Sequence, residues 1–197
     1  MTEELELSKK TDNKYDYSNL GAGLLGYTLS QTANKTYQEL LQENIFTTFI
    51  MTKTTTEKNQ IKPFLVTGQN PEGIIVPYWD LGILAGAGVI LSSAEAVSKF
   101  AIAQYNNENK ELLLTRAKTS TVNEHMDIGL GWLIIKKQSG ENWVWHNGVT
   151  GGYTSSLSID TTNKNEIILL SNVSAFSLNM GNIDKLCFGL METLERK

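Results

Sequence analysis

The sequence predicts an α+β fold, with a mostly helical region over residues 1–125 and an antiparallel sheet with a covering helix over residues 126–197. Two observations carry this prediction. Apolar residues recur at spacings of three, four and seven in the first region and again at the end of the chain, which is typical of helices with one apolar face. Between these helices, four short strand-like runs are separated by turn residues, as the strands of an antiparallel sheet are. A length of 197 residues fits one domain with a sizeable core.

The first predicted helix follows Tyr17-Ser18-Asn19, a segment whose polar side chains suit a helix cap. One face of this helix is marked by Leu20, Leu24, Leu25 and Leu29. The same stretch contains Gly21, Gly23 and Gly26, each of which costs a helix interior about 1 kcal/mol relative to alanine. We therefore expect this helix to pack closely against another element.

The next elements alternate between capped helices and loops. Thr36-Tyr37-Gln38-Glu39 predicts a capping box, and the helix that it opens carries Leu40, Leu41, Ile45 and Phe46. Residues 52–80 are polar and then interrupted by prolines, which predicts long loops with one short strand at Phe64-Leu65-Val66. Ser92-Ser93-Ala94-Glu95 predicts a second capping box, followed by a helix with Val97, Phe100, Ala101 and Gln104 on it.

The residue pattern changes near residue 126 from helix-like to strand-like. The strand-like runs are Ile128 to Lys136, Asn142 to Gly148, Tyr153 to Ile159 and Glu166 to Ser171. Short connections such as Gln138-Ser139-Gly140 predict antiparallel hairpins. A last helix, from about residue 174, has Ile183, Leu186, Cys187, Leu190, Met191 and Leu194 on one face. We expect it to cover one side of the sheet.

Charge and composition exclude several classes of function. A formal charge of −4 argues against a nucleic-acid or anionic-membrane surface, because either needs a basic patch. The apolar runs are too short to span a bilayer, and the polar start of the chain lacks the apolar centre of a secretion signal. The single cysteine, Cys187, lies in an apolar helix pattern and is interpreted as a buried thiol. With two histidines and one cysteine, we expect neither a metal site nor a cofactor.

The segment from His146 to Gly152 carries the first chemical signal. Alternation along the strand places His146 on the face opposite Trp143 and Trp145. An isolated His-x-Gly is more often a satisfied histidine at a strand end than a ligand contact. Here Gly148 removes a side chain where an extended ligand could approach the strand edge, and two further glycines allow a sharp turn.

Tyr17 is the second residue that suggests a chemical role, and it too has a purely structural interpretation. A tyrosine before a helix is usually a packing residue, with its hydroxyl at the surface. A phenol whose pKa is ordinarily near 10 acts as a base only where neighbouring cations favour phenolate, and this chain offers no obvious lysine for that role. His125 is interpreted as a solvated loop residue, and Trp79-Asp80 as packing.

These two segments resemble the second and third signature elements of the penicillin-recognising serine hydrolases. That family groups class C β-lactamases with D-Ala-D-Ala peptidases and related esterases. The resemblance extends in order through Tyr15 to Gly26, Asn44 to Thr54, Ala85 to Glu95, Gly129 to Trp132 and the histidine-glycine strand. The family's first element, a serine with lysine at the third following position, is absent from these 197 residues.

The resemblance implies a β-lactamase/transpeptidase-like fold, incomplete at the N-terminus, with the active site between the sheet and the helical region. It implies that Tyr17 is the proton-transfer phenol and that Asn19 contacts a substrate amide. His146 would stand where the third element has its basic residue, Asn147 and Gly148 would line the ligand strand, and the Val149 amide would donate to an oxyanion. Histidine at that position favours a peptidase or esterase over a dedicated β-lactamase. We expect the polar tips of Tyr17 and His146 to face one cleft, about 10 Å apart or less.

Three hypotheses follow. The first is the C-terminal part of a serine hydrolase that forms an acyl-enzyme with an amide, peptide, ester or β-lactam, inactive as this chain alone because the nucleophile element is missing. The partners would be a small-molecule or peptide substrate and the missing N-terminal segment. The second is a non-catalytic module that binds a peptide or a cell-wall fragment, and the third is a degenerate remnant. The resemblance implies an exported or cell-envelope protein, although the chain shows no signal peptide.

Overall fold

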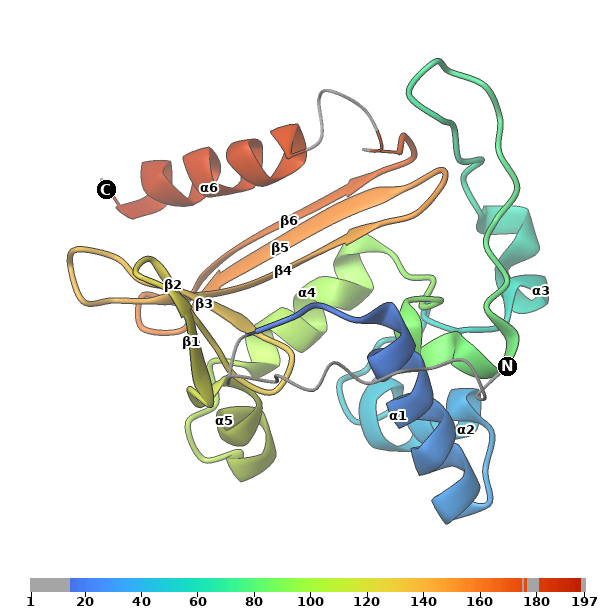
Figure 1. Ribbon diagram of the computed structural model, residues 1–197, viewed down its shortest axis with the longest axis horizontal. Coiled ribbons are helices and arrows are strands. Elements are labelled where there is room, and N and C mark those ends of the chain that lie inside the picture. Colours follow the sequence, from blue (N-terminus) through green and yellow to red (C-terminus); the bar gives the residue numbers. More distant parts are fainter. Residues whose placement is uncertain (1–14, 175, 177–180, 196–197) are drawn as a thin grey trace.

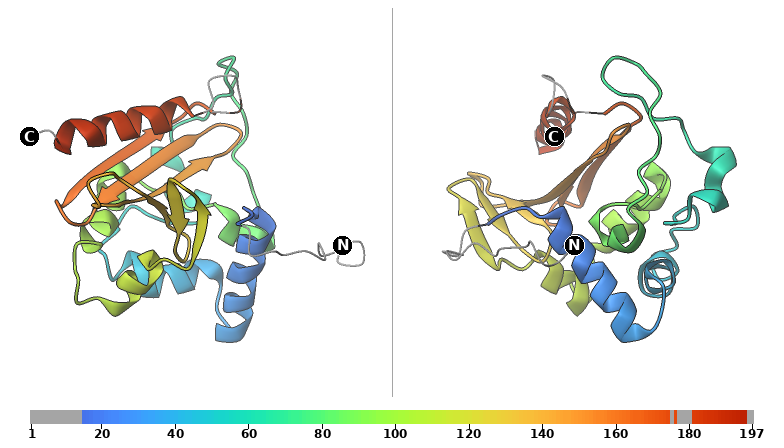
Figure 2. Two further views of the ribbon diagram at one scale, coloured as in Figure 1. Left: turned by 60° about the vertical axis from the view of Figure 1, so that its left-hand side comes forward. Right: turned by 45° about the vertical axis from the view of Figure 1, so that its right-hand side comes forward.

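The computed structural model describes residues 15–174, 176 and 181–195. Within these residues, one sheet lies between helix α6 on one face and α4, with the other helices, on the opposite face (Figures 1 and 2). The helical part of the chain thus lies to one side of the sheet, and the last helix lies to the other. This is the α+β layering that the sequence predicts.

In the part of the chain that the structure describes, the sheet has six antiparallel strands in sequence order. They are β1 (Ser120–Asn123), β2 (Met126–Ile128), β3 (Leu133–Ile135), β4 (Trp143–Val149), β5 (Thr154–Asp160) and β6 (Asn165–Ser171). The antiparallel prediction is therefore confirmed, but the run from Ile128 to Lys136 is not one strand. It turns between β2 and β3, where Gly131 has a φ of 93°, a conformation that favours glycine. The sheet also begins earlier than residue 126, at Ser120.

Helix α6 (Asn182–Glu195) covers the sheet face that carries the tryptophans of β4. The Phe188 ring lies 6.2 Å from the Trp143 ring and 5.2 Å from the Trp145 ring, centroid to centroid. Cys187 and Met191 of the same helix are buried. The covering helix is confirmed, although it begins at Asn182 and not near residue 174; residues 175 and 177–180 lie outside the described part of the chain.

The opposite sheet face packs on α4 (Ala94–Ala103). The buried residues of this core are Ala101, Trp132, Ile134, Val144 and Ile159. Helix α4 begins after Ser93, the N-cap, whose hydroxyl accepts a hydrogen bond from the Ala96 amide. The predicted capping box from Ser92 to Glu95 is therefore wrong: the cap is Ser93, whose third following residue is Ala96, and Ser92 instead bonds the Thr54 hydroxyl at 2.7 Å.

Helix α1 (Asn19–Ala33) begins after Ser18, whose hydroxyl accepts from the Gly21 amide. Its buried residues are Gly23, Gly26 and Ser30, and it packs on the 3-10 segment η3 (Gly82–Ala87). A side chain on Gly26 would place its Cβ 3.0 Å from the Gly86 Cα, so the two backbones touch. The close packing expected of the glycines is confirmed, and Leu24, Leu25 and Leu29 on the predicted leucine face are exposed.

The remaining elements are short. They are α2 (Tyr37–Leu41), η1 (Gln42–Phe46), α3 (Lys58–Ile61), η2 (Lys62–Phe64) and α5 (Lys110–Arg116). The capping box at Thr36 is confirmed, because its hydroxyl accepts from the Glu39 amide and the Glu39 carboxylate accepts from the Thr36 amide. The strand predicted at Phe64-Leu65-Val66 is wrong: Pro63 favours the 3-10 turn η2, and Phe64 is 83% exposed.

Candidate active site

Strand β4 extends beyond the end of its neighbour β3, and this leaves one edge of β4 unpaired with β3. Strand β5 pairs with residues 144–149 of β4, whereas β3 pairs only with residues 143–145. On the β3 side, none of the described strands pairs with residues 146–149. Backbone groups on such an edge can form a ladder with an extended ligand. This edge consists of the predicted site residues His146, Asn147, Gly148 and Val149.

His146 is half-buried and points to the sheet face opposite α6. Its Nδ1 atom lies 2.7 Å from the carbonyl oxygen of Asn147. Because a carbonyl oxygen can only accept, Nδ1 carries a proton in this contact. This contact with the Asn147 carbonyl sets the orientation of the ring.

Gly148 opens this face of the sheet. It is paired with Ser155 of β5, and a Cβ on Gly148 would stand 2.8 Å from the Ser155 Oγ. The Ser155 hydroxyl therefore occupies the space next to Gly148 on the same face as His146, since directly paired residues share a face. Sequence reasoning missed Ser155, because the alternation of β5 gives faces but not the residue that opposes Gly148.

Asn147 turns the other way. Its side-chain amide donates to the Asp184 carboxylate of α6 at 2.9 Å. The expectation that Asn147 lines a ligand strand can therefore be met only through its backbone, because its side chain joins the sheet to the covering helix. Val149 ends the strand, and Thr150 and Tyr153 close the following turn with a backbone hydrogen bond of 2.9 Å.

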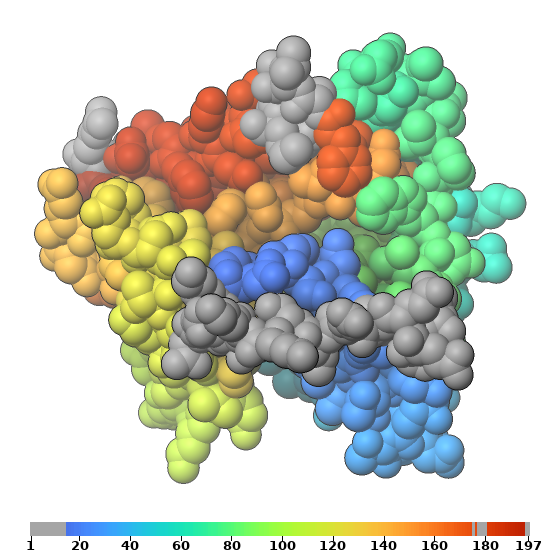
Figure 3. Space-filling view, in the orientation of Figure 1, coloured from blue at the N-terminus to red at the C-terminus, as the bar shows by residue number. Residues whose placement is uncertain are grey.

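Tyr17 and Asn19 are joined directly at the start of α1. The Tyr17 hydroxyl donates to the Asn19 side-chain oxygen at 2.9 Å, and both residues are exposed. Beside them, burial and the nearby Tyr17 and Asp16 raise the pKa of Tyr15. The start of α1 lies next to the sheet in Figures 1 and 2, and Figure 3 shows its surface beside that of the orange strands. That Tyr17 and His146 face one cleft stays a prediction.

The other candidate residues lie away from this edge. Cys187 is buried, its thiol donates to the Ile167 carbonyl, and burial raises its pKa, as expected of an unreactive thiol. His125 is an exposed loop residue beside Glu124. Among the described residues, no group of three His, Cys, Asp or Glu side chains could hold a metal ion, and no helix could cross a membrane.

A hollow of about 450 Å³ lies at the start of β4, not at its free edge. It is lined by Asn107, Leu113, Arg116, Lys118, Asp127, Ile134, Asn142, Val144 and Thr161. None of the predicted site residues is part of this lining. This hollow and the free edge that carries His146 are therefore separate places on the molecule.

Comparison with known sequences identifies one family. A family model described as Beta-lactamase matches residues 1–182. Among curated proteins, the chain is similar to Beta-lactamase-like protein 2 of Dictyostelium discoideum, with 32% identity over 114 residues. That alignment covers 56% of this chain and 20% of the relative, so the chain spans about a fifth of the relative's length.

Comparison with solved structures agrees on the fold. The D-alanine carboxypeptidase AmpC from Burkholderia cenocepacia has a TM-score of 0.77 at 14% identity, covering 90% of this chain and 60% of that one. The β-lactamase/D-alanine carboxypeptidase from Pseudomonas syringae has a TM-score of 0.70 at 19% identity, covering 80% and 54%. The octameric penicillin-binding protein homologue from Pyrococcus abyssi has a TM-score of 0.70 at 21% identity, covering 88% of this chain and 42% of that one. The predicted β-lactamase/transpeptidase-like fold is confirmed.

Proposed function

Because this chain belongs to the β-lactamase family, we propose that it forms the proton-transfer and ligand-strand part of a serine hydrolase. The substrate would be an amide, a peptide, an ester or a β-lactam, and the reaction would pass through an acyl-enzyme. The nucleophilic serine and its lysine would come from outside these 197 residues, in which the Ser-x-x-Lys element is absent. We therefore expect the chain to be inactive on its own.

The observation that carries this proposal is the free edge of β4 over residues 146–149. An extended substrate laid along this edge would hydrogen-bond to the backbone and place its carbonyl group near the Nε2 side of His146. Gly148 keeps the approach open, and the Val149 amide supplies a donor for the developing oxyanion. The D-alanine carboxypeptidases among the structural neighbours, together with a histidine in place of lysine, favour a peptidase or esterase substrate.

The serine oxygen forms a bond to the substrate carbonyl carbon, and its proton passes to the Tyr17 oxygen, held as phenolate by the incoming lysine. When the tetrahedral species collapses, the bond to the amine or alcohol breaks and Tyr17 returns the proton to that leaving group. Water then cleaves the acyl-enzyme by the reverse sequence. When Tyr17 is protonated, its hydroxyl donates to the Asn19 side-chain oxygen, and in the complex the Asn19 side chain would contact the substrate amide.

Covalent labelling tests this proposal. The 197-residue chain should not be labelled by a fluorescent penicillin or by a fluorophosphonate, because neither Tyr17 nor His146 is an activated nucleophile. The same chain preceded by a Ser-x-x-Lys segment should be labelled. In that longer chain, Tyr17→Phe should slow labelling by roughly 10²-fold, the usual scale for loss of an acid–base group.

Two results would contradict the proposal. Labelling of the 197-residue chain at a mapped residue would reveal another nucleophile. Failure of the folded longer chain to be labelled would exclude the proposal that this chain is part of a serine hydrolase. Circular dichroism and a cooperative melt establish in each case that the protein was folded, which matters because exposed apolar surface favours aggregation.

A second candidate function is a non-catalytic module that binds a peptide or a cell-wall fragment. The free strand edge favours it, since an edge suffices for binding whereas acylation needs the absent serine. Binding of an unreactive dipeptide by the 197-residue chain, abolished by Gly148→Val, would support both candidates. Only the labelling of the longer chain separates them.

A further inference from the structure

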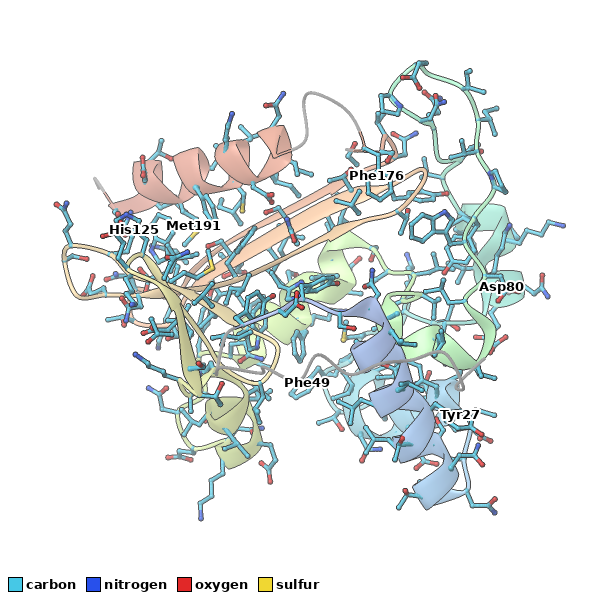
Figure 4. The ribbon with its side chains drawn as sticks, in the orientation of Figure 1. Tyr27, Phe49, Asp80, His125, Phe176 and Met191 are labelled. Atoms are coloured by element: carbon cyan, nitrogen blue, oxygen red, sulfur yellow. The ribbon has the colours of Figure 1, made fainter. Side chains whose placement is uncertain are left out.

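The hollow of about 450 Å³ at the start of β4 has no part in the proposed function. In Figure 4 the labelled His125 lies at the end of the sheet where β4 starts, and the labelled Phe176 lies at the end where β4 finishes. Separate segments of the chain meet around the hollow: the turn before α5, α5 itself, strands β2, β3 and β4, and the residue that follows β5. Its volume falls within the range of about 300–1,000 Å³ that is typical of clefts for small molecules.

Arg116, in the last turn of α5, contributes a half-buried cation to the lining. Among the described residues, its guanidinium forms no ion pair with a carboxylate. Its Nη2 atom donates to the Asn107 side-chain oxygen at 3.0 Å, and burial lowers the pKa of the guanidinium. A cation withdrawn from water is costly until an opposite charge compensates it. Arg116 therefore presents uncompensated charge and unused N–H donors at the hollow.

One carboxylate of the described residues is part of the lining, and two lysines share it. The Asp127 Oδ1 atom lies 3.1 Å from the Lys118 Nζ and 3.0 Å from the Lys136 Nζ. Burial alone would raise the pKa of Asp127, but hydrogen bonds, chiefly those from the two lysines, lower it below its ordinary value, so this carboxyl is charged at neutral pH. Together with Arg116, three cations thus stand around a single carboxylate, and positive charge is in excess.

Two asparagines in the lining have side-chain oxygens that are already engaged. The Asn107 oxygen accepts from Arg116, and the Asn142 oxygen accepts from the Lys137 backbone amide at 3.3 Å. Each side chain keeps an NH₂ group, which can only donate and has no partner among the described residues. The polar part of the lining thus combines donors with excess positive charge, and both are complementary to an anion.

The other part of the lining is apolar. Ile134 of β3 and Val144 of β4 are buried core residues, and Leu113 of α5 is exposed beside them. In small-molecule sites, apolar surface of this kind supplies affinity, and a few polar groups supply orientation. The ligand that fits both parts has one anionic end and an apolar body.

A guanidinium fork matches the two oxygens of a carboxylate. We propose that the hollow binds a small organic carboxylate, whose charged end pairs with Arg116 and Lys118 and whose body lies on the three apolar residues. This site goes beyond the proposed function, because none of the residues 146–149 lines it.

A matched pair of ligands tests the charged end. Phenylbutyrate and phenylbutyramide share one apolar body and differ only in a carboxylate and a neutral amide. Affinity for the 197-residue chain is measured by NMR titration near neutral pH and at low ionic strength. Phenylbutyrate should bind at least about tenfold more tightly, because charge-assisted hydrogen bonds are the strong ones, and added salt should reduce this advantage. The largest shifts should be those of the Asn107 and Asn142 side-chain amides.

Acetate and inorganic phosphate test the apolar body. Acetate has the same charge as phenylbutyrate without the body, so it should bind at least about tenfold more weakly. Inorganic phosphate should also bind more weakly than phenylbutyrate. If phosphate binds as tightly as phenylbutyrate, the hollow recognises anions in general, and the proposal of an apolar carboxylate is wrong.

Variants with matched controls assign the binding to the hollow. Arg116→Gln and Lys118→Gln should each reduce the preference for phenylbutyrate over the amide to about twofold or less, whereas Lys110→Gln, on α5 outside the lining, should leave it unchanged. Leu113→Ala should weaken both ligands by about threefold to tenfold. The neighbouring Leu114→Ala, at an exposed leucine outside the lining, should weaken neither.

Equal affinity for the acid and the amide would overturn the proposal, as would a preference that survives both glutamine variants. Absence of phenylbutyrate binding by the folded chain in the millimolar range would also overturn it. Circular dichroism and a cooperative melt establish that each variant is folded, and because the Lys118 side chain is exposed, its variant decides if Arg116→Gln misfolds. None of these outcomes affects the labelling of the longer chain, so the carboxylate site and the proposed function can fail separately.

Discussion

Helices α6 and α1 each lie against a second element, but they bury opposite kinds of side chain. Helix α6 presents Cys187, Phe188 and Met191 to the sheet, where Phe188 stacks near both tryptophans of β4. Helix α1 presents Gly23 and Gly26 to η3 and leaves its leucines in solvent. One contact is built from apolar area and the other from the near approach of two backbones.

The difference matters for how each part of the fold is held. Apolar burial contributes in proportion to area, so the α6 contact tolerates changes in shape but depends strongly on volume. A backbone contact contributes little area and depends on the absence of side chains, so it tolerates no added atoms. Substitutions that remove atoms should therefore damage the sheet side, and substitutions that add atoms should damage α1.

The largest effect expected from this contrast is that of Trp143→Ala. Trp143 is fully buried, stacks against Phe188, and has the Lys137 ammonium 3.8 Å from its ring centroid. Truncation of such a residue should lower the free energy of unfolding by about 3–5 kcal/mol. Urea unfolding followed by circular dichroism measures this loss. A loss below about 1 kcal/mol would show that α6 does not cover Trp143 in solution.

The second prediction concerns one substitution at two glycines. In Gly86→Ala the new Cβ would stand 2.6 Å from the Ala22 carbonyl oxygen, a backbone atom that can move only with α1. We expect a loss of about 1–3 kcal/mol in the free energy of unfolding. In Gly189→Ala, in the middle of α6, the Cβ would meet nothing within 4 Å. There we expect a gain of roughly 0.5–1 kcal/mol from the better helix former.

Opposite signs for these two alanines, measured in the same unfolding assay, would establish that α1 is held by close approach. Changes of the same sign in the free energy of unfolding would contradict the contrast between α1 and α6. If both stabilised the protein, the α1–η3 contact would be looser than its geometry indicates.

Much of the sheet was predictable because period two and short turns act over neighbouring residues. The divisions within it were not, since residues 128–135 are all apolar or glycine, and only the positive φ of Gly131 in the structure marks the turn between β2 and β3. The exposure of Leu24, Leu25 and Leu29 was not predictable either. Periodicity predicts that a helix has an apolar face, whereas which face is buried depends on what lies next to it.

The same distinction applies to the site. The residues His146, Gly148 and Tyr17 stand out through motif chemistry, and the sequence predicts the strand and the helix start that carry them. The free edge of β4 depends on where β3 ends, and the Asn147 contact with Asp184 spans 37 positions of sequence. The pairing of Trp79 with Phe176 likewise arises only when the long loop meets the chain after β6. None of these long-range contacts leaves a local pattern.

A smaller effect is expected at the capping box of α2, which tests a local signal inside the helical region. Thr36→Ala removes the hydroxyl that accepts from the Glu39 amide, while the Glu39 carboxylate loses its contact with that hydroxyl. The expected loss is about 1 kcal/mol in the free energy of unfolding, with Thr36→Ser as the control that keeps the cap. An equal loss in the serine variant would assign the effect to the lost methyl group and not to the cap.

The smallest effect, and the sharpest test of the contrast, is expected for Leu25→Ala. Leu25 is 62% exposed on the leucine face of α1, and alanine is at least as good a helix former as leucine. The free energy of unfolding should change by less than about 0.5 kcal/mol. Leu112→Ala, at a leucine of α5 that is 5% exposed, makes the same change in a buried setting and should cost about 2–5 kcal/mol. The melting temperature is also measured at two protein concentrations for the native chain and for both variants.

A loss above 1 kcal/mol for Leu25→Ala, together with a melting temperature of the native chain that depends on protein concentration, would mean that the leucine face of α1 is covered in solution. The glycine contact would then be only one of two that hold α1.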